Sequence, residues 1–129
     1  MVSKSLDDLS SIKSIGLDNI DENMAIFDIG EKTIEQISNV MATCKTIFWN
    51  GPLGVYEKPP FDSSTNVIGR AAAILTKGYI ITSVAGGGDT VALLNSMGVV
   101  NNFNFVSTAG GAFLEYLEGK ELHGIKALN

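Results

Sequence analysis

The chain has 129 residues, of which 45% are hydrophobic and 18% charged, and its formal net charge is -5. This composition fits one globular domain with a modest core and excludes an intrinsically disordered chain. The negative charge and the absence of a Lys/Arg cluster argue against nucleic acid or an anionic membrane as a partner, because no basic patch could meet their phosphates.

The first third of the chain predicts short elements followed by one amphipathic helix. Met1 to Gly16 is mixed, and Met24 to Ile29 is apolar enough for a strand that Gly30 ends. Asp28, near the end of that strand, is interpreted as a turn residue. Apolar residues then recur at spacings of three and four, which predicts a helix with one buried face. These residues are Ile34, Ile37, Val40, Met41 and Cys44.

The middle of the chain predicts a buried strand and a second helix. Thr46 to Trp49 is a strand with its tryptophan in the core, and Asn50-Gly51-Pro52 ends it. A proline-stiffened loop follows. The next helix is expected to start with Ser63 or Ser64 as its N-cap and to end at Gly78.

The last third predicts two more strands, each followed by a glycine turn. The β-branched run that begins at Tyr79 indicates a buried parallel strand, which turns through Gly86-Gly87-Gly88 into a helix. Phe103 to Thr108 predicts the last strand, and a second glycine turn opens the helix from Ala112 to Glu118. Leu122 to Asn129 is expected to be a tail.

Strands and helices alternate at βαβ spacing, which predicts a parallel sheet with right-handed connections. We therefore expect an α/β fold, a partial three-layer α/β/α Rossmann-like sheet of about four parallel strands with flanking helices. In such sheets ligands bind at the carboxyl ends of the strands. Three strands here end in turns that suit a ligand, and these turns should lie on one edge of the sheet.

The turn from Gly86 to Asp89 allows two interpretations. A strand that turns through glycines into a helix presents free backbone N–H groups and the positive end of the helix dipole, which is typical of a phosphate site. Asp89 would then hold Mg²⁺ or a water bound to it. Alternatively, this is a tight turn with Asp89 as a plain N-cap.

Several familiar sites are disfavoured by spacing. The chain lacks the GxxxxGK[ST] pattern of P-loop proteins, and Gly86-Gly87-Gly88 lacks the GxGxxG spacing of dinucleotide-binding folds. Ser83 and Ser107 lie outside a GxSxG elbow, and His123 has no partner at metal-ligand spacing. Glu57 is equally well a solvated charge or an acceptor for ribose hydroxyls.

Cysteine content and targeting signals point to an intracellular protein. Cys44 is the only cysteine, which excludes a disulfide framework or a cysteine metal site within one chain, and it is expected to be a buried thiol. No signal-peptide pattern opens the chain, and no apolar run approaches about 18 residues. A cytoplasmic location is expected.

Four motifs together resemble one known family. In chain order they are Asp28-Ile29-Gly30, Trp49-Asn50-Gly51-Pro52-Leu53-Gly54-Val55-Tyr56-Glu57, Ala85-Gly86-Gly87-Gly88-Asp89-Thr90 and Val106-Ser107-Thr108-Ala109-Gly110-Gly111-Ala112. They resemble phosphoglycerate kinase, as do the closing residues 114–120 and 124–128. The resemblance covers nearly the whole chain. It implies that residues 1–129 are the C-terminal portion of the family's nucleotide-binding domain.

The resemblance implies a kinase of glycolysis, which transfers a phosphoryl group between 1,3-bisphosphoglycerate and MgADP with Mg²⁺ and ATP/ADP as its cofactors. It assigns six residues to the nucleotide, namely Asn50, Glu57, Gly87, Gly88, Asp89 and Thr90. Glu57 would hold the ribose and Asp89 the Mg²⁺. The backbone N–H groups near Gly110 and Gly111 would face the transferring phosphoryl group, which makes these two glycines the catalytic candidates.

The chain departs from the family pattern in two small ways and one large one. Glu31 stands in place of a proline, and Ala109 replaces the first glycine of the second triplet. The basic phosphoglycerate-binding domain and the first strands of the nucleotide domain have no counterpart here. The chain alone is therefore expected to be inactive and to meet 3-phosphoglycerate only together with the missing domain. The alternative is a non-catalytic nucleotide-binding or assembly module with the same fold.

The family's strand order adds an expectation about the sheet edge. Thr46 to Trp49 should pair on one side with the strand from Tyr79 to Ser83 and should lack a neighbour on the other side. An apolar strand with an unpaired edge invites pairing with another chain, so self-association is expected.

Overall fold

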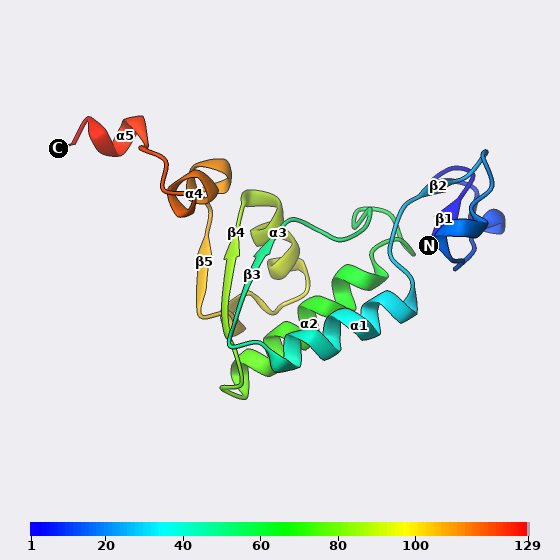
Figure 1. Ribbon diagram of the computed structural model, residues 1–129, viewed down its shortest axis with the longest axis horizontal. Helices are drawn as coiled ribbons and strands as arrows, with labels where there is room; N and C mark the ends of the chain where they lie inside the picture. The colour runs from blue at the N-terminus through cyan, green and yellow to red at the C-terminus, as the bar shows by residue number, and fades with distance from the viewer. Residues whose placement is uncertain (129) are drawn as a thin grey trace.

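The computed structural model describes residues 1–128, and its centre is a parallel sheet of three strands (Figure 1). The strands β3 (Thr46–Asn50), β4 (Thr82–Gly86) and β5 (Phe105–Ser107) lie in the order β3-β4-β5. The longer helices are α1 (Glu31–Thr43), α2 (Ser63–Lys77), α3 (Gly88–Ser96) and α4 (Gly110–Leu117). The expected α/β fold with a parallel sheet is thus confirmed, and so is the pairing of β3 with β4.

The fourth strand expected at Met24 to Ile29 does not join this sheet. Only β2 (Ala25–Ile26) forms there, and it pairs antiparallel with β1 (Val2–Ser3) in a separate small sheet. The backbone of the segment is engaged elsewhere, since the Phe27 N–H donates to the Met1 carbonyl (3.1 Å) and the Phe27 carbonyl accepts from the Val55 N–H (2.9 Å). The resulting lobe lies at the far end of α1 from the sheet (Figure 1).

Element boundaries also differ near the ends of the strands. Tyr79 has a positive φ of 58° and is almost fully exposed, so the chain turns there and β4 begins only at Thr82. The last long helix starts at Gly110, two residues before the expected Ala112. The tail contains a short helix, α5 (His123–Lys126), while its last residue, Asn129, lies outside the described part of the chain.

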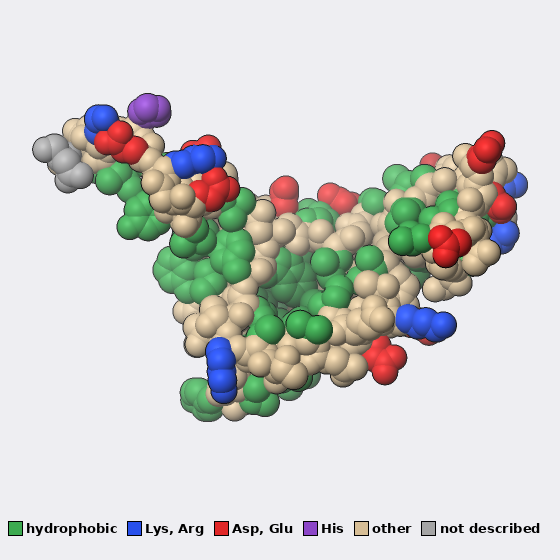
Figure 2. All heavy atoms as spheres, viewed as in Figure 1, with side chains coloured by type: hydrophobic (Ala, Val, Ile, Leu, Met, Phe, Trp, Pro, Cys, Tyr) green, Lys and Arg blue, Asp and Glu red, His purple; other side chains and the backbone are tan. Residues whose placement is uncertain are grey.

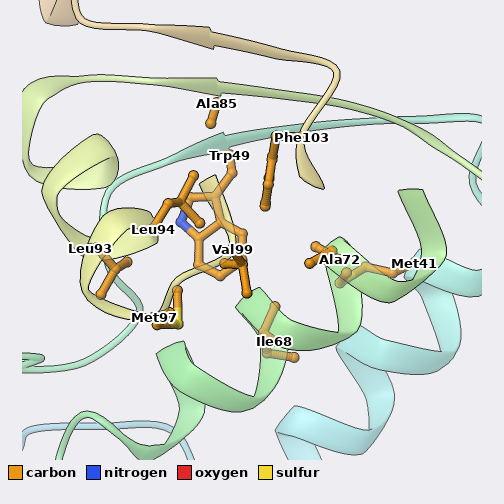
Figure 3. Packing of buried hydrophobic residues seen from close by; sticks show 11 residues of the cluster. Met41, Trp49, Ile68, Ala72, Ala85, Leu93, Leu94, Met97, Val99 and Phe103 are labelled. Carbon is orange, nitrogen blue, oxygen red and sulfur yellow. The ribbon is translucent and has the colours of Figure 1, made fainter. Parts of the chain in front are cut away.

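The main core lies between the sheet and the helices on one of its faces, with Trp49 of β3 at its centre, as expected (Figure 3). The indole packs among side chains from α2, α3 and the segment that follows α3. The buried cluster comprises Met41, Trp49, Ile68, Ala72, Ala73, Ala85, Leu93, Leu94, Met97, Val99 and Phe103. Gly69 of α2 allows Met97 to pack closely against that helix, because a Cβ at position 69 would lie 2.6 Å from the Met97 methyl carbon.

The opposite face of the sheet is only partly covered. Phe48 of β3 is 41% exposed and Phe105 of β5 is 54% exposed. Phe113 of α4 packs against both, with ring centroids 5.6 Å from Phe48 and 5.9 Å from Phe105. The third layer of the predicted architecture is therefore represented here by α4 alone.

The outer edge of β3 pairs with no strand in the described part of the chain. An apolar groove of about 360 Å³ lies along it, lined by β3 together with Ile37 and Met41 of α1 and Ile68 of α2. In Figure 2 hydrophobic side chains line the hollow in the middle of the visible face. The expected open edge is thus present. Among the described helices, none combines the length and apolarity that a membrane span requires.

Candidate functional site

The carboxyl ends of the three parallel strands meet at one edge of the sheet. The register pairs Asn50 of β3 with Gly86 of β4, and Gly86 in turn with Ser107 of β5. The three turns that follow these residues were expected to lie together, and the register brings them side by side.

Hydrogen bonds join the three turns to one another. The Gly51 N–H, just beyond β3, donates to the Thr90 hydroxyl oxygen at 2.7 Å. The Gly87 N–H, just beyond β4, donates to the Ser107 carbonyl at 3.1 Å. Because the bonds run from turn to turn, the three strand ends form one connected rim.

Two helices begin at this rim without a side-chain cap. Gly87 is the N-cap residue of α3 and Ala109 that of α4, and neither helix start has a side-chain cap bond. In the described part of the chain, the N–H groups of residues 88–90 and 110–112 have no partner. A Cβ on Gly110 would lie 3.7 Å from the Gly87 Cα, so the two helix starts are in contact. Their free N–H groups and positive dipole ends form a candidate anion site.

The start of α2 differs from the starts of α3 and α4, because a carboxylate of the chain itself occupies it. Asp28 is 2% exposed, and its carboxylate accepts from the Ser64 N–H (3.1 Å), the Ser64 hydroxyl and the Ile29 N–H (2.8 Å). Asp28 is therefore more than a turn residue. The N-cap position belongs to Asp62, not to Ser63 or Ser64 as expected. An internal carboxylate thus closes this helix start to a ligand.

The glycines of the rim are required for two different reasons. Gly87 has φ +101°, and a Cβ there would approach the Asn50 Oδ1 to 3.1 Å. Gly88 has an ordinary φ and faces open space, as does Gly111. The first glycine therefore satisfies the backbone, whereas the other two leave room in front of the helix starts.

Asp89 lies in the first turn of α3 and its side chain is exposed. Since Gly87 is the N-cap, the interpretation of Asp89 as a plain N-cap is wrong. No group of three or more His, Cys, Asp or Glu side chains in residues 1–128 is arranged to hold a metal. Mg²⁺ is commonly held by one or two carboxylates together with substrate phosphates, and a lone Asp89 beside an anion site fits that mode.

Glu57 is exposed on the loop between β3 and α2, close to Tyr56. Loss of hydration raises the pKa of the Tyr56 hydroxyl above 10.0, and the Glu57 and Asp89 carboxylates raise it further. Both carboxylates therefore oppose ionisation of the same hydroxyl.

Thr90 and Asp28 have structural partners that the sequence did not reveal. Thr90 is 1% exposed, and its hydroxyl oxygen accepts the Gly51 N–H of the turn after β3. Among the remaining polar residues, Ser83 is buried and bonded to the Thr76 hydroxyl at 2.8 Å. His123 is exposed on α5, away from the rim.

Comparison with known proteins gives one consistent family. The family model described as phosphoglycerate kinase matches residues 1–120. A phosphoglycerate kinase of Rhizorhabdus wittichii is 52% identical over 116 residues, which are 90% of this chain and 29% of that protein. One from Cereibacter sphaeroides (strain ATCC 17025) is 55% identical over 104 residues, which are 81% of this chain and 26% of that protein.

Solved structures give the same result. The chain matches the phosphoglycerate kinase of Coxiella burnetii with a TM-score of 0.81 and 36% identity, covering 99% of this chain and 32% of that one. The Pyrococcus horikoshii enzyme matches with a TM-score of 0.69 and 33% identity over 81% of this chain and 25% of that one. The chain therefore spans about a third or less of its relatives' length.

Proposed function

Because the chain belongs to the phosphoglycerate kinase family, we propose that residues 1–129 are the C-terminal portion of that kinase's nucleotide-binding domain. In this proposal the rim binds the phosphates of MgADP or MgATP. The whole enzyme would transfer a phosphoryl group between 1,3-bisphosphoglycerate and MgADP, in the cytoplasm and as a step of glycolysis.

The observation that carries the proposal is the contact between the uncapped starts of α3 and α4. Each helix N-terminus is equivalent to about half a positive charge, so two in contact approach one full charge before any cation is added. Nucleotide phosphates are anions with several oxygens, which suits several converging N–H groups. Phosphoryl transfer depends mainly on this kind of positioning and electrostatic support.

Each rim residue has a role in this proposal. Residues 88–90 present backbone N–H groups to the phosphates, and Asn50 presents its amide beside Gly87. Asp89 would hold the Mg²⁺, which when bound neutralises charge on the phosphate oxygens. Glu57 would accept from the ribose hydroxyls. The N–H groups of Gly110 and Gly111 would face the transferring phosphoryl group, which makes them the catalytic candidates.

The chain alone should bind nucleotide weakly and catalyse no transfer. Phosphoryl transfer between two anions requires cations that hold both in line, and the nine Lys and Arg residues are scattered along the chain. None of them lies in the three turns of the rim, and Lys58 is paired with Asp7. 3-Phosphoglycerate would bind only together with the family's other domain.

The experiment is an NMR titration of the chain with MgADP. Wild type should show shifts in residues 87–90 and 110–112 that weaken when Mg²⁺ is removed. Asp89→Ala should lose the Mg²⁺ dependence, whereas Glu35→Ala, which removes an exposed carboxylate on α1, should behave as wild type. Equal responses of wild type and Asp89→Ala would remove Asp89 from the site. No shifts at all in the rim would refute the proposal.

A second candidate function, a non-catalytic assembly module, is favoured by the open edge of β3. The strand TIFWN carries no charge or proline of the kind that protects natural edges, and an apolar groove runs beside it. In this proposal the chain self-associates through that edge. Sedimentation at several concentrations tests it, with Phe48→Lys as the variant expected to remain monomeric. A wild-type monomer at every concentration would exclude it.

A further inference from the structure

The hydroxyl of Thr90 is the most deeply buried polar group of the rim. Its two predecessors in α3, Gly88 and Asp89, are exposed, whereas Thr90 as a whole is 1% exposed. The hydroxyl oxygen accepts the Gly51 N–H at 2.7 Å, across a separation of 39 residues. This contact links the turn after β3 to the first turn of α3.

Gly51 depends on this partner because the sheet ends one residue earlier. The β3–β4 register stops at the pair Asn50 and Gly86, and Gly51 turns away with φ +82°. The Thr90 oxygen thus takes the place of the backbone carbonyl that a longer strand would supply. The residue fixed by this bond is Asn50, whose Oδ1 lies against the position that a Gly87 Cβ would occupy.

We propose that Thr90 is a positioning residue, which holds the Asn50-Gly51 turn against the start of α3 and does not contact the ligand through its hydroxyl. This inference rests on the proposed nucleotide function. Thr90 is only 1% exposed and its hydroxyl oxygen is turned toward the Gly51 N–H, so burial keeps the hydroxyl from a phosphate in front of the rim. Its contribution is to keep the Asn50 amide and the N–H groups of α3 in one arrangement.

Two substitutions separate the hydroxyl from the shape of the side chain. Thr90→Val replaces the hydroxyl by a methyl group and leaves the Gly51 N–H without its partner, whereas Thr90→Ser keeps the oxygen. The matched control is Thr65→Val. Thr65 belongs to α2, is also fully buried, and accepts from the Leu53 N–H (3.1 Å) and the Gly54 N–H (3.4 Å) of the same loop.

The readouts are amide hydrogen exchange of Gly51, the Asn50 side-chain amide resonances and the dissociation constant for MgADP, all measured on the full chain. In Thr90→Val, exchange at Gly51 should accelerate by roughly tenfold or more, since an unsatisfied buried N–H is costly. The Asn50 resonances should shift, and MgADP affinity should fall by about tenfold. Thr90→Ser should retain most of the exchange protection of Gly51 and most of the MgADP affinity. Thr65→Val should lower the melting temperature but leave the Asn50 resonances and the affinity within about twofold.

Two outcomes would overturn the inference. If Thr90→Val weakens MgADP binding while Gly51 exchange and the Asn50 resonances stay as in wild type, the hydroxyl contacts the ligand directly. If Thr65→Val changes the Asn50 resonances and the MgADP affinity as much as Thr90→Val does, the loop responds to any loss of stability and Thr90 has no specific positioning role. If wild type shows no MgADP response, the proposed function fails, and Gly51 exchange together with the Asn50 resonances still decides whether Thr90 holds the turn.

Discussion

Gly87 and Gly88 are neighbours in one triplet, yet their replacement by alanine should have opposite effects on stability. Gly87 has φ +101° and ψ 142°, a conformation that costs a residue with a Cβ about 1–3 kcal/mol. The new methyl group would also lie 3.1 Å from the Asn50 Oδ1, so Asn50 must move by a few tenths of an ångström. We expect Gly87→Ala to lower the free energy of unfolding by about 2–3 kcal/mol.

Gly88→Ala is the matched control for this loss. Gly88 is the first helical residue of α3, and a Cβ there meets nothing within 4 Å. Alanine in a helical conformation is favoured over glycine by up to about 1 kcal/mol. Stability should therefore stay level or rise slightly. The same methyl group stands in front of the helix start, so Gly88→Ala should weaken MgADP binding in a folded protein.

Equilibrium unfolding in urea measures both variants, with fluorescence as the probe because Trp49 is the only tryptophan and is buried. For a chain of this size, a loss of 2–3 kcal/mol corresponds to a fall in melting temperature of roughly 10 °C. Equal stability of Gly87→Ala and Gly88→Ala would refute the reasoning from backbone conformation. Unchanged MgADP binding by Gly88→Ala would show that phosphates do not approach the start of α3.

Three further predictions follow from contacts of single residues. Gly86→Ala should cost about 1–3 kcal/mol, because its Cβ would lie 2.8 Å from the Phe113 ring, and Phe113→Leu in the same chain should recover part of that loss in urea unfolding. Asp28→Ala should lower stability by about 3 kcal/mol, since it removes the carboxylate that accepts from Ser64 at the start of α2 and leaves buried donors unpaired. A thermal melt within about 2 °C of wild type would contradict this. Asp89→Asn should lower the pKa of Tyr56, while loss of hydration still keeps that pKa above 10.0. An ultraviolet titration measures this pKa, with Tyr56→Phe as the reference. A Tyr56 pKa that Asp89→Asn leaves unchanged would show that the two groups are not close.

The sequence predicts the parallel sheet and the meeting of the three turns because both follow from local signals. Buried strands carry β-branched and aromatic runs, and their glycine turns mark where each strand ends. In contrast, the fate of Met24 to Ile29 depends on carbonyl and N–H partners at Met1 and Val55. A strand pattern alone does not say which neighbour will satisfy the backbone.

Within the rim, the sequence identifies residue types but not their tasks. Gly87 and Gly88 are indistinguishable in the printed sequence, and only the backbone angles show which one needs to be glycine. Thr90 and Asp28 are polar residues at turns, where a ligand contact or a cap is the usual expectation. Their actual partners lie 39 and 36 residues away, at distances along the chain that no spacing rule covers.

The internal hydrogen bonds of the rim have a consequence for the timing of binding. Since the bonds from Gly51 and Gly87 already hold the three turns together, a phosphate meets a site that needs no rearrangement before contact. Association should then be fast, and the weak nucleotide binding expected of this chain must result from rapid dissociation. In an NMR titration the rim resonances should move continuously, in fast exchange, with bound lifetimes in the millisecond range or shorter.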